Sequence, residues 1–309
     1  SARGLVDLLR AALPEGRKGE ALYVRYDFSP GKAINVFDTH LGCRHPLPLE
    51  KAFLDNFLAL VTTPLNEQPF EAMDQFLALV VAEAYRMLST EGPNRRTKPY
   101  IPGLCPPVDA ALARCGIKLR ADAWWWDAVD ALFDAGDLRD AELAQRHAAP
   151  LLEDLIDASR TDQVEQLFRK VVQNPPENML ERFARYVRDF IRRYPSLNMP
   201  TRIEFGPARV VVLDLDAVAP TGSRTAARQT HMAYMLARHM IGRRFFVRPE
   251  YAEAAPPRYR AFHRDGFRAV YESVKALDMD EFQRASAQPH VLDMVERDAR
   301  EGPKHGLDI

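Results

Sequence analysis

The chain has 309 residues, 47% of them hydrophobic and 28% charged, and 42 Lys and Arg nearly balance 43 Asp and Glu. The formal net charge of −1 excludes a general positive field that would attract nucleic acid or an anionic membrane. No apolar run approaches the roughly 20 residues that cross a bilayer, and the N-terminus lacks the apolar part of a signal peptide. We therefore expect a soluble, cytosolic protein with room for about two domains.

Residues 1–90 predict the first part of an α/β domain. Apolar spacing indicates the helices, and β-branched and aromatic runs indicate the strands. The predicted elements are a helix over 1–13, strands at 21–26 and 33–38, and helices at 50–60 and 70–88.

Residues 91–200 predict an all-helical insertion domain, introduced by a Pro- and Gly-rich boundary loop. Asp122 is expected to cap a helix that ends at Gly136, and Asp137 is expected to cap the next one. No strand pattern appears between 108 and 194.

Two features of this insertion invite a functional interpretation. The run Trp124-Trp125-Trp126 is compatible with base stacking, but helical spacing points Trp125 inward and favours core packing. The helix predicted over 179–194 is rich in arginine, but Glu181 and Asp189 dilute its charge, which favours a solvated or partner-facing surface over a phosphate backbone.

Residues 201–309 predict a return to α/β structure, with strands separated by helices and therefore a parallel sheet. The predicted elements are a strand pair at 202–205 and 209–215, helices at 226–241 and 259–274, a strand at about 274–279 and a helix at 289–300. Both ends of the chain fall inside predicted elements, so we expect a piece of a longer protein.

Candidate catalytic residues begin with the acidic pair Asp280-Glu281, which ends the last apolar run. In P-loop NTPases such a pair holds the Mg²⁺ shell and acts on the attacking water. The alternative is that the two acids only open a loop or cap a helix. Asp214 and Asp216 end an earlier apolar run and compete for the same role, with a strand-end cap as their alternative.

The other half of a nucleotide site is missing from the sequence. The nearest match to G-x-x-x-x-G-K-[ST] runs from Tyr26 to Ala33, with Tyr26 in place of the first Gly and Ala33 in place of the Mg²⁺-binding hydroxyl. Basic residues near the C-terminus are compatible with a phosphate clamp or an arginine finger, but a solvated helix face is the favoured interpretation. These basic residues are Arg284, Arg297, Arg300 and Lys304.

The three cysteines and eight histidines predict no transition-metal site. Cys43, Cys105 and Cys115 fit no C-x-x-C spacing, and their odd number argues against a disulfide framework. His231 and His239, eight positions apart, hold no metal geometry by themselves. We expect reduced structural cysteines and no metal other than Mg²⁺.

Several segments, taken in order, resemble the cytoplasmic ATPases of type IV secretion and conjugation systems of the TraU/IcmB (DotO) kind. The resemblance covers nearly the whole chain, although no single segment is specific. The segments are 34–38, 42–44, 46–50, 125–136, 145–147, 151–154, 212–215, 233–239, 280–284, 297–298 and 300–302.

The resemblance implies a RecA-like P-loop NTPase core interrupted by an all-helical insertion, with ATP and Mg²⁺ as cofactors of the parent protein. Asp280-Glu281 is then the Walker B pair, with Asp280 holding Mg²⁺ through water. Beside this pair, Arg300 is a weaker catalytic candidate and Lys304 a weaker nucleotide contact. The P-loop is expected upstream of Ser1, so this chain alone should not hydrolyse ATP. The implied partners are its own subunits, as a hexamer, and inner-membrane and coupling components of the channel, with the protein peripheral at the inner membrane.

The chain departs from the family pattern in two places, one of which involves two positions. The family tends to read Arg-Glu-Gly-Arg-Lys-Trp where this chain has Pro303 in the fourth place and His305 in the sixth, and Gln283 stands where His is usual. Pro303 puts a phosphate-contacting role for that turn in doubt. Two alternatives therefore stay open: a non-catalytic docking or scaffold component with an NTPase fold, and a DNA-pumping coupling ATPase, which the neutral net charge disfavours.

Overall fold

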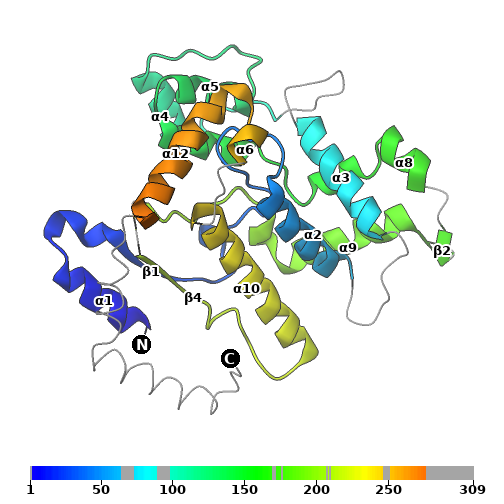
Figure 1. Ribbon diagram of the computed structural model, residues 1–309. Helices are drawn as coiled ribbons and strands as arrows, with labels where there is room; N and C mark the ends of the chain where they lie inside the picture. Colours follow the sequence, from blue (N-terminus) through cyan, green and yellow to red (C-terminus); the bar gives the residue numbers. More distant parts are fainter. Residues whose placement is uncertain are drawn as a thin grey trace.

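The computed structural model describes residues 2–275 except 64–72, 89–97, 169–171, 175–176, 207, 209 and 246–250. Within these residues the protein is mostly helical (Figure 1). The elements are α1 (Ala2–Ala12), η1 (Glu15–Glu20), β1 (Ala21–Arg25), η2 (Pro30–Lys32), α2 (Pro48–Thr62), α3 (Met73–Leu88), α4 (Pro106–Arg114), α5 (Trp125–Asp134), α6 (Leu138–Ala148), α7 (Asp154–Ala158), α8 (Asp162–Phe168), β2 (Val172–Asn174), β3 (Glu177–Asn178), α9 (Met179–Arg193), η3 (Pro195–Leu197), β4 (Val210–Asp214), α10 (Arg224–Phe245), α11 (Tyr251–Ala254) and α12 (Pro257–Lys275).

Within the described residues, the parallel sheet consists of β1 and β4, which are far apart in the sequence. They pair in parallel, from Ala21 opposite Val210 to Arg25 opposite Asp214. The strands predicted at 21–26 and 209–215 are therefore confirmed, as is their place in a parallel sheet. After β4 the chain enters α10, which packs against α2 in the centre of Figure 1.

The other two predicted strands in this part, 33–38 and 202–205, are wrong. Both segments are irregular, and they contact each other through single hydrogen bonds instead of a ladder, such as Arg202 N to Ala33 O at 2.9 Å. The side chain of Asn35 accepts a hydrogen bond from Phe37 N at 3.0 Å. This local turn bends the backbone out of an extended path, as short amide side chains commonly do.

The segment predicted to be wholly helical contains the small antiparallel hairpin β2–β3, which the sequence pattern did not predict.

The predicted cap at Asp122 is also wrong, because α5 begins three residues later. Its N-terminus is held by Asp127, whose carboxylate accepts a hydrogen bond from Trp124 N at 2.8 Å. The other two signals are confirmed: Gly136 follows α5 with φ of 79°, and Asp137 caps α6 by accepting a hydrogen bond from Asp140 N.

The larger hydrophobic core lies among α2, α3, α7, α9 and α10. It includes residues from each of the three predicted ranges, for example Phe57, Phe183 and Met232, all of which are buried. The predicted deep burial of the helix at 70–88 is confirmed by α3, in which Phe76 and Val80 are fully buried. The shared core ties the helical segment to the α/β part, while the domain boundaries at 91 and 200 stay predictions.

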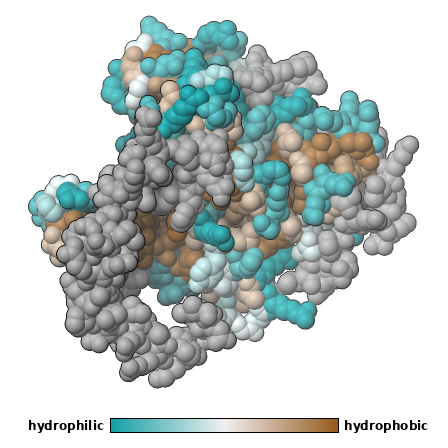
Figure 2. All heavy atoms as spheres, in the orientation of Figure 1, coloured by the Kyte–Doolittle hydropathy of each residue, from teal (hydrophilic) through white to brown (hydrophobic). Residues whose placement is uncertain are grey.

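The second core lies among α4, α5, α6 and α12, at the top of Figure 1. Trp125 and Trp126 are both buried in it, which confirms that the tryptophan run packs internally. The Trp125 ring stacks on His147 with 4.5 Å between centroids, and the Arg44 guanidinium lies 4.6 Å from the centroid of Trp126. Figure 2 shows mostly polar residues over this part of the surface and an apolar area over α3.

Gly42 lies where the loop after residue 34 contacts α12, at a position that admits no side chain. Its φ is +77°, in the left-handed region, and a Cβ built there would come 2.2 Å from the ring of Tyr259. The close contact between this loop and α12 therefore requires glycine.

The C-terminal part of the predicted α/β fold lies mostly beyond the described residues. Helix α12 runs to Lys275, so the first two residues of the strand predicted at 274–279 are helical instead. The rest of that strand and the helix at 289–300 lie outside the described residues. Among the helices that are described, none has both the length and the apolar character needed to cross a membrane.

Candidate functional site

The residues predicted to form the nucleotide site do not fall in the described part of the chain. Asp280, Glu281, Arg300 and Lys304 all lie beyond Lys275, and so do the other basic candidates, Arg284 and Arg297. Their roles, and the Mg²⁺ assigned to Asp280, stay predictions.

Asp214, the competing acid, lies at the C-terminal end of β4 in a capping arrangement. Its carboxylate accepts hydrogen bonds from the hydroxyl of Tyr23 on the neighbouring strand and from Asp216 N, the latter at 3.0 Å. The Tyr23 hydrogen bond is the main reason that the pKa of Asp214 is lowered. These contacts favour the strand-end interpretation over a catalytic one.

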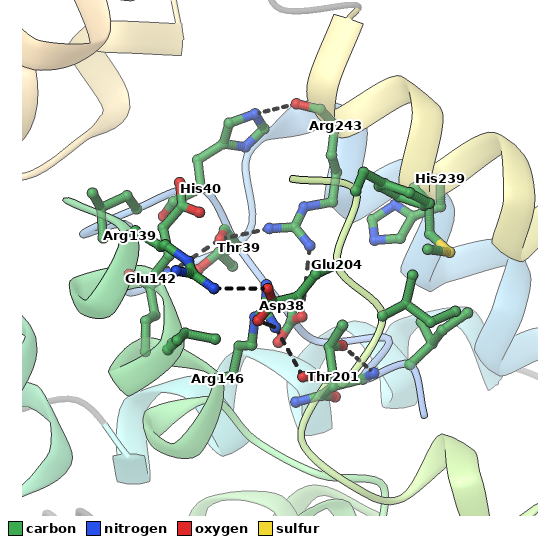
Figure 3. Close-up of a pocket in the computed structure, with 18 of the residues that line it drawn as sticks. Asp38, Thr39, His40, Arg139, Glu142, Arg146, Thr201, Glu204, His239 and Arg243 are labelled. Carbon is green, nitrogen blue, oxygen red and sulfur yellow. Dashed lines mark hydrogen bonds and ion pairs between the residues drawn. The ribbon is translucent and has the colours of Figure 1, made fainter. Parts of the chain in front are cut away.

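A cavity lined by many polar side chains, here called the loop pocket, has a volume of about 830 Å³. It lies between the loop 34–41, α6, the segment 201–206, the C-terminal part of α10 and α12 (Figure 3). Its polar lining residues are Asn35, Asp38, Thr39, His40, Arg139, Glu142, Gln145, Arg146, Thr201, Glu204, His239, Arg243 and His263.

Glu50, in the first turn of α2, anchors the loop behind this pocket. The side chain is 1% exposed and accepts hydrogen bonds from Leu47 N at 2.7 Å, His40 N at 3.0 Å and, at 2.7 Å, the His40 ring. The other ring nitrogen of His40 lies 2.9 Å from the carbonyl oxygen of Arg243. A buried carboxylate with this many donors fixes the loop against both α2 and α10.

Arg243 supplies the positive charge at the base of the pocket, and Figure 3 shows its guanidinium pointing toward Thr39 and Asp38. It donates a hydrogen bond to Thr39 O at 2.7 Å and lies 3.5 Å from Glu50 and 3.8 Å from Asp38. One cation therefore neutralises two buried carboxylates, which makes the loop, α2 and α10 depend on one another electrostatically.

Gln145 of α6 connects the same loop to the helical segment. Its amide nitrogen donates to Thr39 O at 3.1 Å and to His40 O at 3.0 Å, while its amide oxygen accepts from Gly42 N at 2.6 Å. The loop backbone thus replaces regular strand pairing with side-chain partners from another element.

Three residues in the pocket wall have buried polar atoms without a hydrogen-bond partner in the described part of the chain. These atoms are Oδ1 of Asp38, Nε of Arg243 and both ring nitrogens of His239. Burial raises the pKa of Asp38, although Arg243 acts in the opposite direction. Burial, followed by the charge of Arg243, lowers the pKa of His239 well below its usual range, so the ring is neutral and stacks on Phe53 with centroids 3.8 Å apart.

The mouth of the pocket carries charges of both signs. Glu204 lies 3.3 Å from Arg139 and 3.7 Å from Arg146, so two residues of α6 pair with the segment that leads into β4. Arg146 also donates to Thr201 O at 3.1 Å. The balanced lining suits a polar ligand with donors and acceptors better than a highly charged phosphate chain.

The loop pocket lies on the amino side of β4, because residues 201–206 precede that strand and His239, Met240 and Arg243 belong to the far end of α10. Open α/β sheets bind their ligands beyond the carboxyl ends of the strands. The pocket is therefore distinct from the place where a nucleotide is expected.

Metal binding is not supported in the part of the chain described here, which contains no group of three or more His, Cys, Asp or Glu side chains arranged to hold an ion. Cys43, Cys105 and Cys115 form no disulfide with one another, and they are buried, partly buried and exposed, respectively. Burial raises the pKa of the Cys43 thiol to about 12, which makes it unreactive at neutral pH.

The sequence did not single out Asp38, His40, Glu50 or Arg243. Only Glu50 carried a local signal: it stands at the third position of a helix that starts with Pro48, where an acidic residue commonly closes a capping box. That signal predicts a capping contact but not burial, and nothing local links the loop to Arg243. No protein-family model, curated protein or solved structure matches the chain.

Proposed function

We propose that this chain is part of an ATPase that energises a type IV secretion or conjugation system, acting in pilus assembly or in transfer of DNA or protein. The observation that carries the proposal is the parallel pairing of β1 with β4 around a long, mostly helical stretch. An inserted helical region between neighbouring parallel strands is the arrangement expected from the resemblance of the sequence.

The catalytic part of the proposal rests on Asp280 and Glu281. Asp280 would hold Mg²⁺ through water and Glu281 would act on the water that attacks ATP. The phosphates would be held by a P-loop encoded upstream of Ser1, with Arg300 and Lys304 as weaker contacts. The parent would work as a homo-oligomer, proposed to be a hexamer, in the cytoplasm at the inner-membrane base of the channel.

The test is Mg²⁺-dependent ATP hydrolysis by the parent protein that contains this segment. Glu281→Gln is expected to lower the rate by about 10² to 10⁴, as the loss of a catalytic base does. Asp216→Asn is the matched control, because Asp216 is exposed beyond β4 and competes for the same role in the sequence; it should leave the rate unchanged. The 309-residue chain alone should not hydrolyse ATP, and Glu281-dependent hydrolysis by it would overturn the proposal.

A second candidate is a non-catalytic docking or scaffold component that keeps the α/β fold. The observation that favours it is the absence of G-x-x-x-x-G-K-[ST] from these 309 residues. It predicts that the parent also lacks this motif upstream and that wild type and Glu281→Gln are equally inactive. Direct DNA binding, the third possibility, predicts an affinity that falls steeply with salt.

A further inference from the structure

A second cavity, here called the arginine pocket, lies at the opposite end of α10 from the loop pocket. Its volume is about 300 Å³, and it is formed by the end of α2, the second half of α9 and the first turns of α10. Because α10 follows β4, these first turns lie on the carboxyl side of the strand, where α/β proteins commonly bind ligands.

The walls of the arginine pocket combine apolar surface with positive charge. Side chains from all three helices form the apolar wall, and the aromatic ring of Tyr194 is part of it. Arg193 and Arg228 also line the cavity, against a single carboxylate, Asp189, which is ion-paired with Arg192 outside the lining. Arg185 lies in the lining as well but already has an interaction partner. The cavity therefore carries an excess of positive charge.

Arg228 is the most informative residue of this pocket. It is partly buried, and it makes no hydrogen bond or ion pair with any of the residues that the structure describes. Burial lowers its pKa, Tyr194 acts in the opposite direction, and the nearby charge of Arg193 lowers it further, yet a guanidinium stays protonated at neutral pH. A cation that is partly withdrawn from water beside another cation is unfavourable unless an anion accompanies it.

Neutral polar groups complete the site. Gln229 is held in place, since its amide nitrogen donates to Val218 O at 3.2 Å and its oxygen accepts from the hydroxyl of Tyr194 at 3.3 Å. Thr225 in the first turn of α10 adds an exposed hydroxyl. The start of this 22-residue helix also favours negative charge.

We propose that the arginine pocket binds a phosphate-type oxyanion attached to a small apolar or aromatic group, with Arg228 as the main ligand. The guanidinium groups of Arg228 and Arg193 bind the oxyanion, and the ring of Tyr194 with the aliphatic wall covers the attached group. This proposal does not depend on ATP hydrolysis, because it uses no residue of the predicted nucleotide site.

The test is calorimetric titration of the 309-residue chain with phenyl phosphate and with inorganic phosphate. Phenyl phosphate should bind more tightly, because it fills the apolar wall as well, and its affinity should fall as salt rises. In Arg228→Gln the affinity should drop by about tenfold or more, the loss expected for one charge-assisted contact. The matched control is Arg224→Gln, which removes an exposed arginine of the same helix outside the pocket and should bind like wild type.

Arg228→Lys keeps the positive charge but removes the planar guanidinium. Its affinity for phenyl phosphate should lie between those of wild type and Arg228→Gln. If Arg228→Gln does not fold, Arg228→Lys still tests whether the guanidinium of Arg228 binds the ligand. A second measurement, sedimentation with phosphatidylcholine vesicles containing phosphatidic acid, separates two sources of the same chemistry. Vesicle binding that phenyl phosphate displaces identifies a lipid headgroup, and its absence identifies a soluble ligand. No saturable binding of phenyl phosphate, or equal binding by Arg228→Gln, overturns the proposal.

Discussion

The loop pocket and the arginine pocket lie at the two ends of α10, and each contains arginine side chains partly withdrawn from solvent. In the loop pocket, Arg243 contacts Thr39 O and lies close to the carboxylates of Glu50 and Asp38. In the arginine pocket, Arg228 has no carboxylate or carbonyl partner among the described residues. The first arrangement pairs its arginine with carboxylates of the protein itself and stabilises the fold, whereas the second leaves positive charge available to a ligand.

This difference shows why pocket size alone does not identify a binding site. The loop pocket is the larger of the two, yet most of its polar atoms already have protein partners, and its place on the amino side of β4 is unusual for ligands. The arginine pocket is smaller but combines uncompensated charge with an apolar wall on the carboxyl side of the strand. Three substitutions test the contrast.

The largest effect is expected for Glu50→Ala. This removes the acceptor of three hydrogen bonds and leaves Arg243 with Asp38 as its remaining carboxylate, so the free energy of unfolding should fall by about 3–5 kcal/mol. Urea unfolding followed by circular dichroism measures the change. Asp55→Ala on the exposed side of the same helix is the control and should change stability by no more than about 0.5 kcal/mol. If the free energy of unfolding fell equally little in both variants, the carboxylate of Glu50 would not anchor the loop.

The second prediction concerns His239, whose ring is buried without hydrogen-bond partners in the described part of the chain. Its pKa is lowered in the folded state, so below pH 6.5 the unfolded chain binds a proton that the folded chain excludes. Stability is therefore fully present above pH 6.5 and falls as pH decreases, by up to about 1.4 kcal/mol per pH unit for one such group. Replacing the ring with an apolar side chain, His239→Leu, should reduce this loss.

The measurement is urea unfolding at pH 7.5 and pH 5.5 for wild type, His239→Leu and His231→Gln. The last is the control, because His231 is exposed on the same helix. Some acid sensitivity should persist in every variant, since burial also lowers the pKa of His263 and brings that of His147 to about 4. Asp38, whose pKa burial raises, acts in the opposite sense in all three proteins. If wild type and His239→Leu lost the same stability between pH 7.5 and pH 5.5, His239 would not titrate as argued.

The sequence predicted what depends on neighbouring residues and missed what depends on distant ones. Apolar periodicity identified α2, α3, α9, α10 and α12, and the apolar run at 209–215 identified β4, because burial of one face leaves a repeating pattern. The segments 33–38 and 202–205 have the composition of strands but lack a ladder. Their backbone is held instead by single bonds and by side chains such as Gln145, which no local pattern indicates.

The candidate sites follow the same rule. The arginine content of α9 was visible in the sequence, and a partner-facing surface was one of its interpretations. The pairing of that helix with Arg228, more than thirty residues later, requires the packing of α9 beside the start of α10. In the loop pocket, Glu50 and Arg243 are brought together by the packing of α2 on α10.

The smallest effect is expected for Arg228→Met, measured by urea unfolding in a buffer without phosphate. Methionine keeps the packing of the aliphatic stem and removes a partly buried charge that has no counter-ion in the described structure. The free energy of unfolding should therefore stay within about 1 kcal/mol of wild type or rise slightly. The matched change at the other end of the helix, Arg243→Met, leaves Glu50 and Asp38 without their cation and should cost about 3 kcal/mol or more. If Arg228→Met were as destabilising as Arg243→Met, Arg228 would hold the fold together as Arg243 does, and its charge would not be free for a ligand.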